Sequence, residues 1–494
     1  MTEQATPLPV VEEPTGPSTS LRQGAIGVLG ILFFVLSAQA PLTGIAGALP
    51  LTILLGNGAG APGAYLVIGI VIVLFAVGFI AMSRHVDAKG AFYAYISAGI
   101  GKRVGTGSAW LAVLAYATVQ AAMYGLFGAS VSALLANFGL TIPWWLPVLI
   151  TIAIVQMLGS LNIELGARVL AILVGFEFAI LIAFALDVFF TGGGAHGGRL
   201  DLAASFAPSS VLAGAPGVAL MFAVASMFGF ESTAIYSGEA KDAKRTVARA
   251  TYLSVAIIAL FFSFVSWMFI SYYGAGKAVG AAHKAVSSGD STSFVFTALD
   301  GMLGGWAGIV AGILLITSLF AGILAFHNGI NRYLHALGSQ GSLPRRVAHT
   351  NRHQAPSFAA WVQTTIAVVL IAPFAIFNLD PVLTLFSWFS GLAVAALVAL
   401  YVLCCAAVVT YFARNGIRGK IWQHYVAPIL AGAALIGVLW LVVANFTVLI
   451  GGDVTLAGIL LGIVPIVFVV GSVTDRQHKA SKRLHESVRA ASRG

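Results

Sequence analysis

The feature that most constrains this chain is a series of long apolar segments. Each holds about 20 or more mostly apolar residues, enough to cross a bilayer as a helix. A β-barrel would instead show strands that alternate apolar and polar residues over about ten positions. The sequence therefore predicts an all-α polytopic membrane protein with 12 transmembrane helices. The twelve segments lie at residues 25–54, 64–83, 108–136, 144–162, 168–190, 214–237, 249–272, 303–327, 358–378, 383–411, 425–446 and 454–473.

The composition agrees with a membrane protein rather than a soluble one. Hydrophobic residues make up 59% of the chain and charged residues 9%, whereas a soluble domain carries about 25% charged residues. The net charge of +9 would indicate a nucleic-acid partner only on a basic face of a soluble module. Cys404 and Cys405, the only cysteines, are adjacent in an apolar run, so we expect no disulfide, metal site or cofactor.

The basic residues predict the orientation of the chain. If the N-terminus is cytoplasmic, every Lys and Arg except Arg199, Lys277 and Lys284 lies on the cytoplasmic side, as the positive-inside rule requires. We therefore expect both termini in the cytoplasm. Residues 1–20, rich in Pro, Thr and Glu, are predicted to form a disordered tail. Residues 21–474 would form the membrane domain, and residues 475–494 a basic tail lying against anionic lipid.

Two segments carry interruptions that predict broken helices. The first contains Pro41 within Ser37–Gly47, and the sixth places Gly229 and Glu231 within Ala225–Thr233. Interruptions at corresponding positions of two halves indicate an inverted repeat with a substrate site between the breaks. Broken helices 1 and 6 would expose backbone donors and carbonyls, which bind a carboxylate and a cation. The alternative is a pair of kinks that only bend packing helices.

The ionisable residues at membrane depth are acids. Glu177 and Glu231 are candidates for coupling or proton binding. A charged side chain inside a bilayer is costly unless it is paired or hydrated, so an acid at this depth indicates a functional residue. The alternative is a structural carboxylate that caps a half-helix. Thr317 and Ser318 offer hydroxyl oxygens for a sodium site, or they bond back to their own helix.

The third segment carries Tyr116, Gln120 and Tyr124 at helical spacing. These side chains would face a polar cavity or serve interhelical packing and hydrogen bonding. The sequence lacks a GxxxxGK[ST] phosphate-binding loop, and no arrangement of nucleophile and base is legible. We therefore expect neither ATP-driven transport by this chain alone nor an enzyme.

Three stretches together resemble the amino acid/polyamine/organocation superfamily of secondary transporters, from about Gly24 onward. Residues 83–110 look like its cytoplasmic loop with a Gly-aromatic-Tyr signature. Residues 228–250 are similar to its GFE sequence and the acidic and basic loop that follows, and residues 331–359 to its Arg-Tyr, Gly-x-Leu-Pro and closing Pro pattern. The resemblance implies a five-plus-five inverted repeat over about 24–190 and 214–411, extra helices over 425–473, and alternating access.

The resemblance also implies where a substrate binds. Its carboxylate would meet the first break and its amino group the carbonyls of the sixth. Together with the third segment, these breaks give a predicted substrate-binding set of Ala40, Pro41, Leu42, Thr43, Gly44, Tyr116, Tyr124, Ser226, Met227, Phe228, Gly229 and Phe230.

The chain departs from the superfamily at three points. Ala40–Ile45 replaces the usual Gly-Ser/Ala-Gly-Ile sequence of the first break. Ala225 stands where some exchangers carry an aromatic gate. The fifth segment lacks the lysine of some proton-coupled members, since no lysine lies between Arg168 and Arg199. Coupling must therefore use an acid, sodium or exchange.

These observations favour an amino acid permease of the plasma membrane that works as a symporter, with proton- or sodium-coupled uptake. An amine or putrescine-like polyamine carrier, in which Glu177 or Glu231 pairs with the ammonium group, is the alternative, as is an amino acid exchanger. A nutrient sensor that binds without transport is a different class, which the short tails do not favour. No oligomeric state follows from the sequence.

Overall fold

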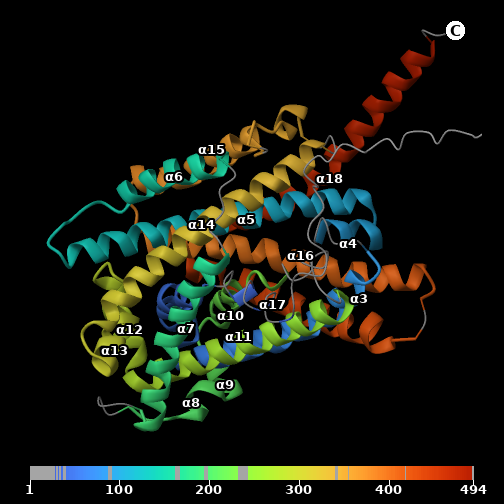
Figure 1. Cartoon of the computed structure of the whole chain (residues 1–494). Helices are drawn as coiled ribbons and strands as arrows, with labels where there is room; N and C mark the ends of the chain where they lie inside the picture. Colours follow the sequence, from blue (N-terminus) through green and yellow to red (C-terminus); the bar gives the residue numbers. More distant parts are fainter. Residues whose placement is uncertain are drawn as a thin grey trace, which may run out of the picture.

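The computed structural model describes residues 28, 32, 35–36, 40–86, 92–161, 167–193, 198–231, 243–339, 343–353, 355–417 and 419–491, the last 17 by their backbone alone. The predicted tail at 1–20 lies outside the described residues. Within them the chain forms helices and turns and no strand (Figure 1), as the apolar segments predict. The helices are α2 (Leu49–Leu51), α3 (Ala61–Ser83), α4 (Phe92–Gly99), α5 (Lys102–Ala136), α6 (Trp145–Ser160), α7 (Ala167–Phe190), α8 (Leu202–Phe206), α9 (Pro208–Val211), α10 (Pro216–Ser226), α11 (Ala243–Tyr273), α12 (Ala278–Ser287), α13 (Ser293–Leu303), α14 (Ala307–Ser339), α15 (Ser357–Ile376), α16 (Ser387–Arg414), α17 (Ala427–Leu449) and α18 (Val454–Ala491). Shorter helical turns are η1 (Thr43–Ala48), η2 (Thr52–Asn57), η3 (Gly58–Gly60), η5 (Arg345–Ala348), η6 (Pro381–Phe386) and η7 (Trp422–Val426).

In the described part of the chain, 9 helical runs are long and apolar enough to span a membrane. The first, Thr43–Ser83, joins the first two predicted segments. It leaves helical geometry at Gly56, and Gly58 takes a positive φ of 61° that favours glycine. The predicted segments at 144–162 and 214–237 overlap shorter apolar helices, α6 and α10.

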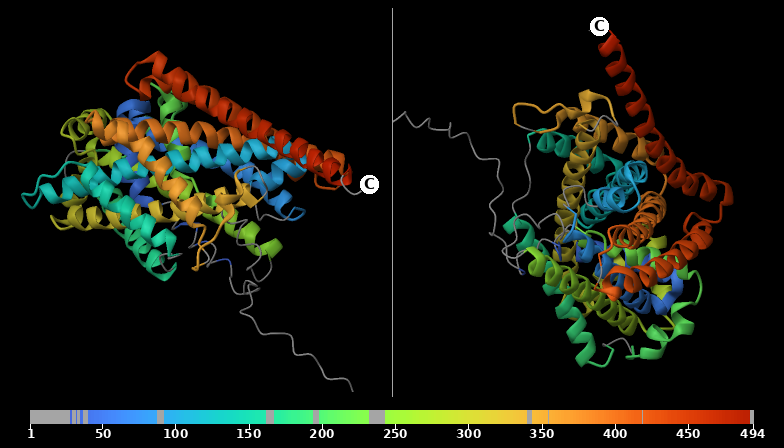
Figure 2. Two further views of the ribbon diagram at one scale, coloured as in Figure 1. Left: turned by 90° about the horizontal axis from the view of Figure 1, so that it is seen from above. Right: turned by 90° about the vertical axis from the view of Figure 1, so that its right-hand side faces the viewer.

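Helix α5 organises the bundle. It packs against α14, α16 and α18, while α3 packs against α11 and α10 against α17. Figure 1 shows α6 and α15 side by side at one edge, and α12 and α13 together at one end. In Figure 2, α18 runs along the side of the bundle and its C-terminal part extends beyond it.

The core of the bundle is aromatic where spans from both halves of the chain meet. Phe75 and Phe79 of α3 contact Phe230 beyond α10 and, through Phe75, Tyr401 of α16. All four side chains are essentially fully buried. Ring pairs of this kind stabilise packing by about 0.5–1.5 kcal/mol beyond their buried area, so they hold the segment after α10 firmly against α3 and α16.

Candidate functional site

The first predicted interruption coincides with an unusual backbone conformation. Ala40 has a φ of 41°, in the left-handed region that non-glycine residues rarely adopt. A helical run begins directly after it at Pro41. Proline is favoured at the first position of a helix, because a backbone N–H there would have no partner within the helix. The backbone N–H groups of Thr43 and Gly44 donate to the carbonyl of Ala40. Ala40 is 7% exposed and Leu42 is fully buried, so this helix start lies inside the protein.

A carboxylate from a distant helix meets this helix start. Glu177 of α7 is fully buried, and its Oε2 accepts a hydrogen bond of 3.0 Å from the backbone N–H of Leu42. The interaction pairs a negative group with the positive end of a helix. Within the described part of the chain, Glu177 Oε1 has no hydrogen-bond partner, and the same holds for the buried Thr43 Oγ1. The first break therefore has two buried oxygen atoms, one on Glu177 and one on Thr43, that lack hydrogen-bond partners among the described residues.

The two predicted breaks lie against each other at Gly44. A Cβ atom built on Gly44 would lie 2.4 Å from Cε1 of Phe262 and 3.0 Å from Oγ of Ser226. The Phe262 ring of α11 stacks on Tyr65 of α3 with centroids 5.4 Å apart, and the Tyr65 hydroxyl lies between Ser226 and Thr52. Only glycine fits this approach of η1 to the end of α10.

The second break follows the end of α10. Helix α10 stops at Ser226, whose hydroxyl donates to the carbonyl of Phe222. Gly229 then takes a φ of 107°, a conformation that glycine adopts without steric cost. The turn allows the Glu231 carboxylate to accept a 3.0 Å hydrogen bond from the N–H of Gly229. Residues 232–237, the rest of the predicted sixth segment, lie outside the described residues.

Tyrosines surround Glu231. The hydroxyls of Tyr116 and Tyr401 donate to its carboxylate, and the hydroxyl of Tyr333 is hydrogen-bonded to that of Tyr116. The Tyr116 ring also contacts Phe228 and Tyr333 at centroid distances of 5.5 and 5.6 Å. Glu231 is 4% exposed, so its polar contacts are with these groups rather than with water.

The two hydroxyls considered for a sodium site differ in their surroundings. Thr317 donates its hydroxyl to the carbonyls of Ile313 and Leu314 within α14. Ser318, 6% exposed, lies beside the Glu177 carboxylate. Ser318 therefore joins the first break, whereas Thr317 has the helix-bonded arrangement that threonine commonly adopts in membrane helices.

The three polar residues of the third segment also differ in their surroundings. Tyr116 faces Glu231, as described above. The Gln120 amide donates to the carbonyl of Ile323 at 2.9 Å and accepts from Gln363, tying α5 to α14 and α15. Tyr124 is buried at 2% exposure. Gln120 thus serves interhelical bonding, and of the three residues Tyr116 adjoins a break.

Sequence reasoning missed four aromatic residues of the site. Phe262 and Tyr65 flank Gly44, and Tyr333 and Tyr401 adjoin Glu231. Phe262, Tyr65 and Tyr401 lie in apolar segments where aromatic residues are common, Tyr333 lies just beyond the eighth segment, and the partner of each is distant in sequence. Tyrosine inside an apolar run was the one available signal, because its buried hydroxyl needs a partner.

The described side chains contain no group of three or more His, Cys, Asp and Glu residues placed to hold a metal ion. What the geometry offers instead is two buried helix ends, each with its own carboxylate, meeting at Gly44 and Ser226. Such ends bind small charged groups through backbone donors and carbonyls.

Comparison with known proteins shows the family of the chain. The amino acid permease family matches residues 26–470. A branched-chain amino acid permease, BcaP, of Lactococcus lactis subsp. cremoris (strain MG1363) is 25% identical over 347 residues, covering 64% of this chain and 70% of that protein. A putative amino-acid transporter of Clostridium perfringens (strain 13 / Type A) is 24% identical over 143 residues, which are 29% of this chain and 28% of that protein. The chain belongs to the amino acid permease family and is a multi-pass membrane transporter, not an enzyme.

Proposed function

We propose that this protein is a secondary active transporter that moves an aliphatic, zwitterionic amino acid across the plasma membrane by alternating access. The observation that carries the proposal is the meeting of two buried helix ends from the two halves of the chain, at Gly44 and Ser226. The proposed architecture has twelve spans, a five-plus-five inverted repeat and two cytoplasmic termini. Because the breaks are buried, substrate enters only when the helices that cover them move.

The surroundings of the first break support an aliphatic substrate. Aromatic and aliphatic side chains line it: Phe262 lies against Gly44, and Leu126 and Phe386 lie against Gly47. No Lys or Arg occurs in the interior of the apolar segments, so the substrate carboxylate would bind backbone N–H groups rather than a basic side chain. The similarity to a protein named as a branched-chain amino acid permease points the same way.

Coupling is assigned in this proposal to the first break. Glu177 contacts the helix start through Leu42, keeps Oε1 without a partner among the described residues, and has Ser318 beside it. A proton bound there would neutralise the carboxylate, and sodium would use the same oxygen atoms together with Thr43. Either ion would change how tightly α7 holds the helix start, which links ion binding to the movement of that helix.

Counterflow into proteoliposomes tests the transport proposal. Vesicles loaded with unlabelled leucine, valine or isoleucine should accumulate the labelled amino acid from outside, and vesicles without protein should not. Binding of leucine without any counterflow would contradict transport and favour a sensor.

The Glu177→Gln variant tests the coupling. It keeps an oxygen atom for the Leu42 N–H and removes the charge. We expect counterflow to persist and accumulation against a gradient to be lost, because exchange does not require net ion movement. Glu231→Gln is the matched comparison. Equal accumulation by wild type and Glu177→Gln would contradict this assignment.

A second candidate is an amine carrier. The Glu231 carboxylate, with Tyr116 and Tyr401 donating to it and the Phe228 ring nearby, offers a negative and aromatic environment that suits an ammonium group. Labelled putrescine belongs in the same counterflow panel. A signal with putrescine and none with amino acids would make the amine carrier the better description.

A further inference from the structure

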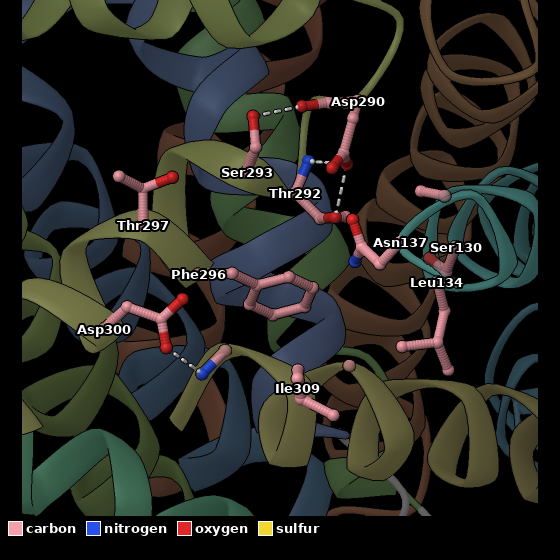
Figure 3. A pocket seen from close by; sticks show the side chains of 13 residues that line it. Ser130, Leu134, Asn137, Asp290, Thr292, Ser293, Phe296, Thr297, Asp300 and Ile309 are labelled. Atoms are coloured by element: carbon pink, nitrogen blue, oxygen red, sulfur yellow. Dashed lines mark hydrogen bonds between the residues drawn. The ribbon is translucent and has the colours of Figure 1, made fainter. Parts of the chain in front are cut away.

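A cavity separate from the two breaks lies between α5, α13 and the start of α14 (Figure 3). Its volume is about 180 Å³, and none of the residues that line it belongs to either break. Ser130 and Leu134 of α5 line it, at the spacing that places side chains on one helix face, together with Asn137 directly after the helix. Phe296 and Asp300 line it from α13. On the proposed topology, this end of the bundle faces away from the cytoplasm.

The lining is negatively charged. Asp290 and Asp300 contribute carboxylates, and no Lys, Arg or His is among the residues that line the cavity. Asp290 Oδ1 accepts from the N–H and hydroxyl of Thr292, and Asp300 Oδ1 accepts from the N–H of Gly308 at 2.7 Å. These bonds fix both carboxylates in place while leaving their charge uncompensated by any basic side chain of the lining.

A buried hydroxyl in the lining has no partner. Ser130 is 5% exposed, and its Oγ makes no hydrogen bond within the described residues. Elsewhere in α5, Thr106, Ser108 and Thr118 donate to carbonyls of their own helix. A buried polar atom without a partner costs about 1–3 kcal/mol. Ser130 lines the cavity, so a small rotation of its side chain would let the hydroxyl bond to a molecule inside it.

The rest of the lining distinguishes between kinds of cation. Leu134, Phe296 and Ile309 contribute apolar side chains (Figure 3). Asn137, Thr292 and Thr297 add oxygen atoms elsewhere in the lining, but a metal ion prefers oxygen ligands on all sides, and the apolar side chains leave one wall without them. An organic ammonium ion carries a charge that suits the carboxylates and a carbon chain that suits the apolar wall. A zwitterion is a poorer fit, because no basic residue lines the cavity to pair with its carboxylate.

We propose that this cavity binds an organic ammonium ion with a short apolar chain. The two carboxylates, which lie on different sides of Phe296 in Figure 3, attract the ammonium group, and the carbon chain lies against Phe296 and Leu134. The ligand contacts α5, α13 and α14 together. This site is distinct from the transport site, and the proposal holds whichever substrate the breaks carry.

Titration calorimetry on the full chain in lipid nanodiscs tests the proposal, with n-butylammonium as the probe and n-butanol as its neutral counterpart. We expect the amine to bind and the alcohol not to bind. Asp290→Asn, Asp300→Asn and Ser130→Ala should each weaken binding, the two charge removals by about tenfold. Asp201→Asn and Asp453→Asn are matched controls, since both aspartates cap helices outside the cavity.

A variant that fills the cavity distinguishes a loss of amine binding from a general loss of folding. Gly312 lines the cavity, and a Cβ atom there would make only ordinary contacts of 3.7 Å with Leu134 and Phe296. Gly312→Leu should abolish amine binding while its thermal midpoint stays near that of the wild type. Leucine counterflow, measured on the same preparation, reports separately on the transport site and should persist.

Two results would overturn the proposal. One is amine binding that Ser130→Ala, both aspartate variants and Gly312→Leu leave unchanged, since the amine would then bind elsewhere. The other is displacement of n-butylammonium by calcium or sodium at millimolar concentration, which would make the cavity an inorganic cation site.

Discussion

The carboxylates at the two predicted breaks are hydrogen-bonded in different ways. At the first, a helix start is paired with a carboxylate 135 residues away, and that carboxylate keeps one oxygen atom without a partner among the described residues. At the second, Glu231 pairs with the N–H of Gly229, two residues away, and tyrosines surround it. Glu177 thus keeps an unsatisfied oxygen atom among the described residues, whereas Glu231 accepts hydrogen bonds from its own turn and from tyrosines of α5 and α16. On the function proposed above, this difference favours Glu177 for coupling and Glu231 for structural support.

The contact that joins the two breaks is the most sensitive point of the comparison. Gly44→Ala places a methyl group 2.4 Å from the Phe262 ring, so the ring or η1 must shift. We expect a loss of about 1–3 kcal/mol in the free energy of unfolding and a strong loss of counterflow. Gly437→Ala is the control, since nothing lies within 4 Å of its added methyl group. Equal behaviour of the two variants would show that the breaks do not depend on this approach.

Amide substitution should separate the two carboxylates. In Glu231→Gln the new NH₂ group faces the hydroxyl donors of Tyr116 and Tyr401, so we expect a loss of about 1–3 kcal/mol. In Glu177→Gln the oxygen still accepts from Leu42, and the NH₂ group can donate to hydroxyls beside it, so stability should change by less than about 0.5 kcal/mol. Chemical unfolding of both variants in the same detergent measures the difference. The opposite order would reverse the roles assigned above.

Removal of single tyrosine hydroxyls tests the same difference between the two predicted breaks. Tyr116→Phe removes a donor to Glu231 and should cost about 1 kcal/mol. Tyr65→Phe removes a buried hydroxyl whose contacts with Ser226 and Thr52 lack good hydrogen-bond geometry, so it should lower stability by less than Tyr116→Phe. Its effect should appear instead in the KM of counterflow, because Tyr65 adjoins the break at Gly44. Thermal melting and counterflow on the two variants test this pair.

The smallest expected effect concerns the hydroxyls of α14. Thr317 bonds only to carbonyls of its own helix among the described contacts, so Thr317→Val should leave both transport rate and ion dependence within experimental error. Ser318→Ala should lower the ion dependence of uptake, because Ser318 lies beside Glu177. A loss of sodium dependence in Thr317→Val alone would move the ion site away from Glu177.

The sequence predicted the helical class, the family and the position of the first interruption, because apolar length, Pro41 and glycine are local signals. It also identified Glu177 and Glu231 as ionisable residues at membrane depth, where a carboxylate requires a partner. It did not predict that Leu42 would be the partner of Glu177, or that Phe262 would close on Gly44. Those contacts join segments far apart in the chain, and their choice depends on how the helices pack. Periodicity within one segment carries no such information.

The left-handed backbone of Ala40 has a consequence for the energetics of opening. An alanine in this conformation stores about 1 kcal/mol that a glycine would not, and the strain is released if Ala40 returns to an ordinary conformation when the helix start moves. If the helix start moves during transport as proposed above, release of this strain favours the movement by about fivefold. Ala40→Gly would then lengthen the time spent in the conformation in which residue 40 has a positive φ, and turnover would slow even though no contact with the substrate had been removed.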